Sequence, residues 1–145
     1  MKSILIFWLI MFIAKISFSQ YSDSTLIVKL LEKESSTWRT GDSIGHATCW
    51  KIEPYSTVII MTADGKTFSI PPGKLANASK QNMGKGGSSK NSNYRMSFHG
   101  NTALVTHDEV STSKAGIINH TFEVRMLKKL KGGWKLTDQS IQVID

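Results

Sequence analysis

The sequence contains a single cysteine, Cys49, among its 145 residues. One thiol cannot form an internal disulfide, so the core alone must hold the fold together even in an oxidising compartment. No second cysteine lies nearby, and a lone cysteine next to Trp50 is typical of a small buried side chain rather than a nucleophile or a ligand. Prolines are also scarce, and all three break the chain between elements: Pro54, Pro71 and Pro72.

No apolar run reaches the roughly 20 residues that a membrane-spanning helix needs. The longest run covers residues 4–14, follows Lys2 and ends shortly before Ser17-Phe18-Ser19. A basic start, a short apolar stretch and small residues two apart are typical of a secretory signal peptide. We therefore expect residues 1–19 to be cleaved after Ser19, and we expect a secreted or periplasmic protein without stable membrane insertion. An uncleaved anchor is the alternative, because Lys15 lies close to the cleavage position.

Net charge is modest in the expected mature chain, residues 20–145. The full chain has 18 basic and 11 acidic residues, and removal of Lys2 and Lys15 with the signal peptide lowers its net charge from +7 to +5. The basic residues lie scattered in loops and are not interleaved with aromatic side chains, as a nucleic-acid-binding surface would require. We expect no nucleic-acid partner. The four histidines lack the spacing of a zinc site, so neither a metal nor another cofactor is expected.

The first half of the mature chain reads as helices and one short hairpin. Leu26, Ile27, Leu30, Leu31 and Trp38 form a helical stripe. A glycine- and lysine-rich stretch later in this half lacks the spacing of a phosphate-binding loop and is expected to be a mobile connection. The expected elements are helices at 22–38, 42–50 and 74–81, a hairpin of 56–62 with 67–70, and a loop at 82–93.

The second half reads as an antiparallel meander, with strands at 94–99, 102–112, 117–130 and 134–144. The turn at Gly100-Asn101 places Phe98 opposite Ala103, and the turn at Gly132-Gly133 places Met126 opposite Asp138. A four-residue loop at 113–116 would bring His107 beside Phe122. One apolar face is then expected to contain Tyr94, Met96, Phe98, Ala103, Val105, His107, Phe122, Val124, Met126 and Leu136, with Glu123 and Arg125 on the wet face.

Helices followed by a meander predict an α+β domain in which the helices cover one face of a curved sheet. The chain resembles the nuclear transport factor 2-like superfamily, in particular small secreted SnoaL-like members. The resemblance rests on Trp50 at the end of the second helix, on the run at 100–105, and on the run at 122–127 that leads to Gly133-Trp134-Lys135-Leu136. It implies a single cone-shaped domain over residues 20–145, with a pocket between the concave antiparallel sheet and about three N-terminal helices, and often a homodimer through the sheet.

The expected apolar face nominates the residues of that pocket. His107 could act as a general base near neutral pH, and a desolvated Asp138 could acquire a raised pKa for the same task. The expected register separates these two residues by about 13 Å along the strands, at roughly 3.3 Å per residue. Structural roles in hydrogen bonds are therefore the alternative for both. The full expected pocket is Trp50, Tyr94, Phe98, His107, Phe122, Val124, Met126 and Asp138.

Two functions follow from this reading. The first is a secreted module that binds a small apolar molecule in the cone or associates as a dimer. The second is an isomerase or lyase, of the ketosteroid-isomerase-like or dehydratase-like kind, that uses Asp138 or His107 as its base. The fold implied by the resemblance does not choose between them, because it carries both enzymes and binding proteins.

Overall fold

The computed structural model describes the backbone of residues 2–145 and the side chains of residues 21–145. The helices are α1 (Lys2–Thr40), α2 (Ser43–Ala47) and α3 (Pro72–Ala76), with a short 3-10 turn at Lys80–Asn82. The strands are β1 (Val58–Met61), β2 (Thr67–Ser69), β3 (Gly87–His99), β4 (Thr102–Ser113), β5 (Ile118–Leu130) and β6 (Gly133–Val143). Within the described part of the chain, no helix is long and apolar enough to cross a membrane.

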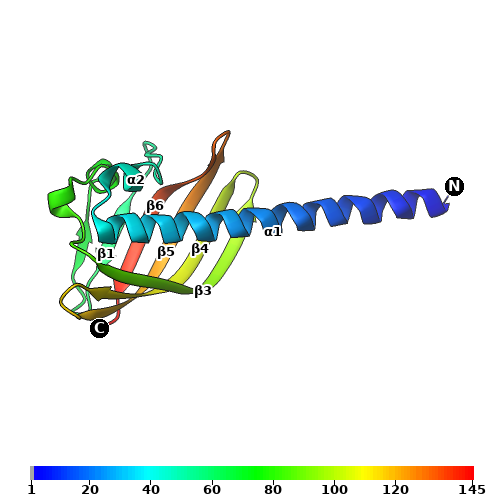
Figure 1. The fold of residues 1–145 in the computed structure, drawn as a ribbon. Coiled ribbons are helices and arrows are strands. Elements are labelled where there is room, and N and C mark those ends of the chain that lie inside the picture. Colours follow the sequence, from blue (N-terminus) through cyan, green and yellow to red (C-terminus); the bar gives the residue numbers. More distant parts are fainter. Residues whose placement is uncertain (1) are drawn as a thin grey trace.

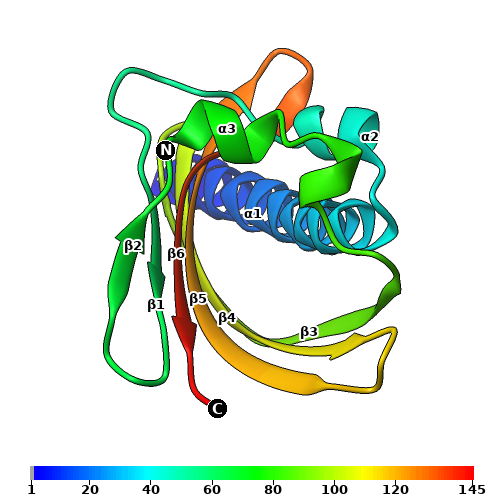
Figure 2. The ribbon, with the colours of Figure 1, turned by 90° about the vertical axis from the view of Figure 1, so that its left-hand side faces the viewer.

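All six strands form one sheet in the order β2-β1-β6-β5-β4-β3. Every neighbouring pair is antiparallel except β1 and β6, which run parallel. The long strands curve strongly, and α1 lies in their concave side with α2 and α3 at one end (Figure 2). This arrangement confirms the expected α+β class, with a curved sheet and N-terminal helices on its concave face. The first half of α1 extends beyond the sheet (Figure 1).

The core lies between α1 and the concave face of the sheet. Ile27 and Leu31, one helical turn apart on α1, are almost fully buried and pack in one cluster with Val105, Leu127 and Leu136 from three neighbouring strands. These two helical positions belong to the stripe that the sequence indicated. The helix therefore docks through its apolar side, and the residues that follow Leu31 on the same side are carried into the interior.

The register between β3 and β4 agrees with the sequence prediction near the turn. Gly100 adopts φ +57°, a conformation that suits glycine, and Phe98 pairs with Ala103. Farther along, an irregularity between Ser92 and Arg95 shifts the pairing by one residue. The aromatic rings of Tyr94 and His107 nevertheless meet, with their centroids 5.3 Å apart.

The expected register between β4 and β5 is wrong by one residue. The backbone N–H of Ser113 donates to the carbonyl of Ile117 and closes the loop, which therefore has three residues rather than four. His107 consequently pairs with Glu123 instead of Phe122. A one-residue slip exchanges the two faces of a strand. Glu123, Arg125 and Leu127 are therefore buried on the concave face, whereas Phe122, Val124 and Met126 lie on the convex face.

Two further expectations need correction. Residues 87–93 belong to strand β3, so the glycine- and serine-rich stretch is largely paired rather than a mobile loop. Its side chains are small and polar, which conceals the period-2 pattern of a strand. The third expected helix, 74–81, divides into α3 and the 3-10 turn.

Trp134 fixes α1 to the sheet near Asp23. Its indole Nε1 donates to Asp23 Oδ1 at 3.0 Å, and its ring meets Phe98 edge-on at 6.0 Å. We expect Trp134→Phe to lower the free energy of unfolding by about 1–3 kcal/mol, because the buried aromatic volume shrinks and the bond to Asp23 is lost. Urea unfolding would measure this, with Asp23→Asn as the variant that removes the charge and keeps the tryptophan. A cost below about 0.5 kcal/mol would contradict the anchoring role.

Candidate functional site

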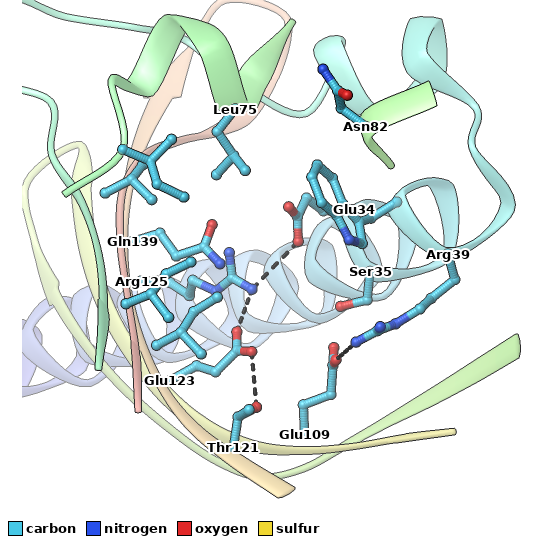
Figure 3. Close-up of a pocket in the computed structure, with 15 residues that line it drawn as sticks. Glu34, Ser35, Arg39, Leu75, Asn82, Glu109, Thr121, Glu123, Arg125 and Gln139 are labelled. Atoms are coloured by element: carbon cyan, nitrogen blue, oxygen red, sulfur yellow. Dashed lines mark hydrogen bonds and ion pairs between the residues drawn. The ribbon is translucent and has the colours of Figure 1, made fainter. Parts of the chain in front are cut away.

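A cavity of about 360 Å³ lies between α1 and the concave face of the sheet. Its volume is within the range of small-molecule pockets, roughly 300–1,000 Å³. The apolar part of its lining consists of Trp38, Val58, Ile60, Ile70, Leu75 and Ile141. The polar side of the lining carries Glu34, Arg39, Glu109, Glu123, Arg125 and Gln139 (Figure 3).

Arg125 lies at the centre of the polar side, between two carboxylates. Its Nη2 donates to Glu123 Oε2 and lies 3.4 Å from Glu34 Oε2, so one guanidinium bridges β5 and α1 (Figure 3). All three residues are at most 4% exposed. Thr121 Oγ1 donates to the second oxygen of Glu123 at 3.1 Å. Because buried charges are tolerated only when they are paired, these contacts fix the three groups against one another.

Glu34 and Glu123 each lie close to a buried histidine that does not line the cavity. His46 Nδ1 is 3.6 Å from Glu34 Oε1, and His107 Nε2 is 3.5 Å from Glu123 Oε2. Burial lowers the pKa of both histidines, so both imidazoles are neutral at neutral pH. The resulting row of side chains runs from α2 to β4 in the order His46, Glu34, Arg125, Glu123, His107.

Burial raises the pKa of Glu34 from 4.5 to about 7, even though Arg125 opposes this shift. The negative charges of Glu123 and Glu109 add to the effect of burial. Desolvation acts to lower the pKa of Arg125, but its two carboxylate neighbours raise it by more, so the guanidinium stays charged. Glu34 is thus a cavity-lining carboxyl group that changes its protonation state near neutral pH.

A second ion pair lies beside this row. Arg39 Nη2 donates to Glu109 Oε1 at 2.7 Å, which ties the last turn of α1 to β4 (Figure 3). The Arg39 side chain is 25% exposed, whereas that of Glu109 is 6% exposed. The pair therefore stands between the interior of the cavity and solvent.

Several buried polar atoms of the lining have no hydrogen-bond partner. They include Nε and Nη1 of Arg125 and Oε1 of Gln139. These two residues are directly opposite each other on β5 and β6. Leaving a buried donor without a partner costs about 1–3 kcal/mol, and more for a charged group, so such atoms are candidates for contact with a bound molecule.

None of the eight residues expected to form the pocket lines this cavity. Trp50 is buried in the core, with its ring centroid 6.2 Å from that of His46. Phe98 packs against Trp134, and Tyr94 against His107. Burial raises the pKa of Tyr94 to about 12, so its hydroxyl stays protonated.

The remaining four lie on or beneath the convex face. Phe122 and Met126 are exposed there, and Val124 lies between them. Asp138 pairs with Met126, as the sequence predicted, and its Oδ1 accepts hydrogen bonds from the backbone N–H and the hydroxyl of Thr57. The structure does not bring His107 and Asp138 together. His107 ends the buried row beside Glu123, and Asp138 is bound to Thr57 in the segment before β1.

Sequence reasoning missed Glu34, Glu123 and Arg125. A signal for Glu34 existed, because it stands three residues after Leu31 and four before Trp38, on the apolar stripe of the helix. Glu123 and Arg125 alternate with apolar residues and so have the pattern of a wet face. Across the described side chains, no group of three His, Cys, Asp or Glu residues is arranged to hold a metal ion.

The curved sheet, the helices in its concave side and the cavity between them define the nuclear transport factor 2-like fold. The chain is similar to an NTF2-like protein of unknown function from Shewanella baltica, with 16% identity, a TM-score of 0.63, and coverage of 85% of this chain and 94% of that one. It is also similar to an NTF2-like protein with a cystatin-like fold from Novosphingobium aromaticivorans, with 13% identity, a TM-score of 0.65, and coverage of 91% and 88%.

A third similar structure, from Streptomyces avermitilis, belongs to the NTF2-like family and has been proposed to be a dehydratase. It shares 15% identity, with a TM-score of 0.66 and coverage of 87% of this chain and 99% of that one. No protein-family model matches the chain, and no curated protein matches it either. At such low identities these similarities establish the fold, whereas the function has to be argued from the site.

Proposed function

We propose that this protein is an exported binding module that holds a small, mostly apolar organic molecule in the cavity between α1 and the sheet. The supporting observation is the cavity itself, since apolar side chains line it together with a few polar groups, the usual composition of a small-molecule site. Export rests on the sequence of residues 1–19 alone. The proposed occupant lies with its apolar body against β1 and α3 and its polar end toward Arg125.

A neutral fluorescent probe, N-phenyl-1-naphthylamine, tests the proposal on the full chain. We expect saturable binding, and we expect Ile60→Trp to weaken it by at least about tenfold, or 1.4 kcal/mol, because the larger side chain fills the cavity from β1. The matched control is Ile44→Trp, the same change at a position 80% exposed on α2. Equal binding by both variants, or no binding by the unaltered protein, would contradict the proposal. Native mass spectrometry of the exported protein would reveal a natural occupant.

Association through the sheet belongs to the same proposal. Leu104, Phe122 and Met126 are exposed on the convex face, and Leu104 pairs with Met126 across β4 and β5. Exposed apolar side chains gathered on one sheet face favour contact with a second copy. We expect a dimer in light scattering that Met126→Glu converts to a monomer. A monomer at all concentrations would remove this part of the proposal.

A second candidate function is an isomerase or lyase that moves a proton, and Glu34 is the observation that favours it. General acid–base catalysis works best with a group whose pKa is near the working pH, and Glu34 combines such a pKa with a place in the cavity wall. His107 and Asp138 do not line the cavity. Once a bound compound is known, Glu34→Gln should abolish its turnover while leaving it bound. Unchanged turnover would rule Glu34 out as the base.

A further inference from the structure

The chemical nature of the ligand's polar end follows from the groups it would meet, and this step rests on the proposed function. Arg125 is 2% exposed, lines the cavity and has unpartnered N–H groups at Nε and Nη1. An arginine side chain is only a donor, so a molecule that satisfies it must present an acceptor oxygen or nitrogen.

The charges around Arg125 decide against an anionic ligand. Three carboxylates line the cavity, and two guanidiniums accompany them. Arg39 is bound to Glu109, and the Nη2 of Arg125 is bound to Glu123, so no guanidinium is free to neutralise a further negative charge. A ligand carboxylate would also lie close to Glu34 and Glu123. Like charges held together at low dielectric strongly disfavour such a complex.

A cationic ligand is disfavoured for a different reason. An ammonium group has three donors and no acceptor, so it would leave the N–H groups of Arg125 unpartnered and place two positive charges side by side. An uncharged carbonyl oxygen avoids both penalties, because it accepts from Arg125 and adds no net charge to the row.

Gln139 supplies a second polar contact next to the first. It pairs with Arg125 across β5 and β6, its Oε1 has no partner, and the two side chains lie next to each other in the cavity (Figure 3). A side-chain amide offers both an acceptor and a donor, so it can pair with a ligand amide in either orientation. The adjacent pair of Arg125 and Gln139 is therefore complementary to a carboxamide.

We propose that the cavity selects uncharged carbonyl compounds, and primary carboxamides above all, whose oxygen is held by Arg125 and whose N–H groups are held by Gln139. Carboxylates and amines of the same shape are rejected. Recognition depends on the charges that are already paired around Arg125, so the protein discriminates by charge as well as by shape.

The protonation of Glu34 gives this selectivity a pH dependence. Because its pKa is about 7, Glu34 becomes neutral below that pH, which removes one negative charge from the lining of the cavity. The groups that face it are Arg125 and Glu123 on β5, Glu109 on β4 and His46 on α2. Rejection of a carboxylate should accordingly weaken as the pH falls from 8 to 6, whereas binding of a carboxamide should change little.

Four naphthalene derivatives with one apolar body test the proposal by titration calorimetry on the full chain. They are naphthalene-2-carboxamide, naphthalene-2-carboxylate, 2-naphthylmethylamine and 2-ethylnaphthalene. At pH 8 we expect the carboxamide to bind at least about tenfold more tightly than each of the other three. We expect Gln139→Leu to reduce the preference for the carboxamide over 2-ethylnaphthalene severalfold. Ile141→Leu, a conservative change beside it in the lining, should preserve the preference.

The outcomes separate this proposal from the one on which it rests. If the four compounds bind equally, or if the carboxylate binds as tightly as the carboxamide at pH 8, selection by charge is overturned while the binding module stands. If neither these compounds nor N-phenyl-1-naphthylamine binds, both proposals fall. The ranking is measured on the unaltered protein, so the test does not depend on the folding of any variant.

Discussion

Arg125→Met should lower the free energy of unfolding by about 3–5 kcal/mol at pH 7, the cost of removing one partner from a buried ion pair. The guanidinium is the only cation in contact with Glu34 among the described side chains, and it also holds Glu123. Without it, both carboxylates remain in the interior with no compensating charge. Urea unfolding followed by circular dichroism would measure the loss. Arg95→Met, at an exposed position on β3, should change the stability by less than about 0.5 kcal/mol.

A combined variant decides whether charge or packing causes the loss. Glu34→Gln and Glu123→Gln, added to Arg125→Met, remove the three charged groups of the row and leave side chains of similar volume. We expect the triple variant to recover most of the lost stability, since replacing a complete buried ion pair is often neutral or stabilising. If Arg125→Met alone stays within about 1 kcal/mol of the unaltered protein, the ion pairs of Arg125 do not stabilise the fold.

Glu34→Gln should stabilise the protein above pH 7 and leave it unchanged at pH 4.5. Because the pKa of Glu34 rises from 4.5 to about 7 on folding, the folded state binds the proton more tightly than the unfolded state does. The stability contributed by the protonated group is fully present below pH 4.5 and is lost as the pH rises to 7. A shift of this size corresponds to about 3 kcal/mol, which glutamine, with no charge to bury, should retain at high pH.

The measurement is the difference in unfolding free energy between Glu34→Gln and the unaltered protein at several values of pH from 4.5 to 8.5. Other titrating groups, including His46 and His107, are present in both proteins and cancel in the difference to first order. Glu32→Gln, at an exposed position on the same helix, is the matched control for the loss of one glutamate from α1. A pH-independent difference for Glu34→Gln would mean that Glu34 ionises normally in the folded protein.

The sequence was sufficient for the fold because the periodicity of α1 and the glycine turns are local signals. The turn at Gly100 set the pairing of Phe98 with Ala103, and the inward face of β4, with Val105 and His107, followed from it. The fold class needed little more than the order of helices and strands.

The site could not be predicted, since it depends on one residue in one loop. Shortening the 113–116 loop by a single position turns β5 over and brings Glu123 and Arg125 inside. The observed register of β5 is stabilised by contacts with Glu34, which lies about 90 residues away in the sequence. Local sequence patterns carry no information on such contacts. Asp138 illustrates the same effect, because its pairing with Met126 was right while the face assigned to both was wrong.

The contacts that seat α1 carry a consequence for the order of folding. Asp23 is bound by Lys129 and Trp134, and Glu34 by Arg125, so both ends of the docked segment wait for the last hairpin of the chain. A chain folding as it is synthesised forms its N-terminal segments first, whereas contacts distant in sequence close late. Helix α1 is therefore synthesised first but completes its packing against the sheet last. Until β5 and β6 emerge, its apolar stripe and its one interior carboxyl group have to remain in contact with water or with a chaperone.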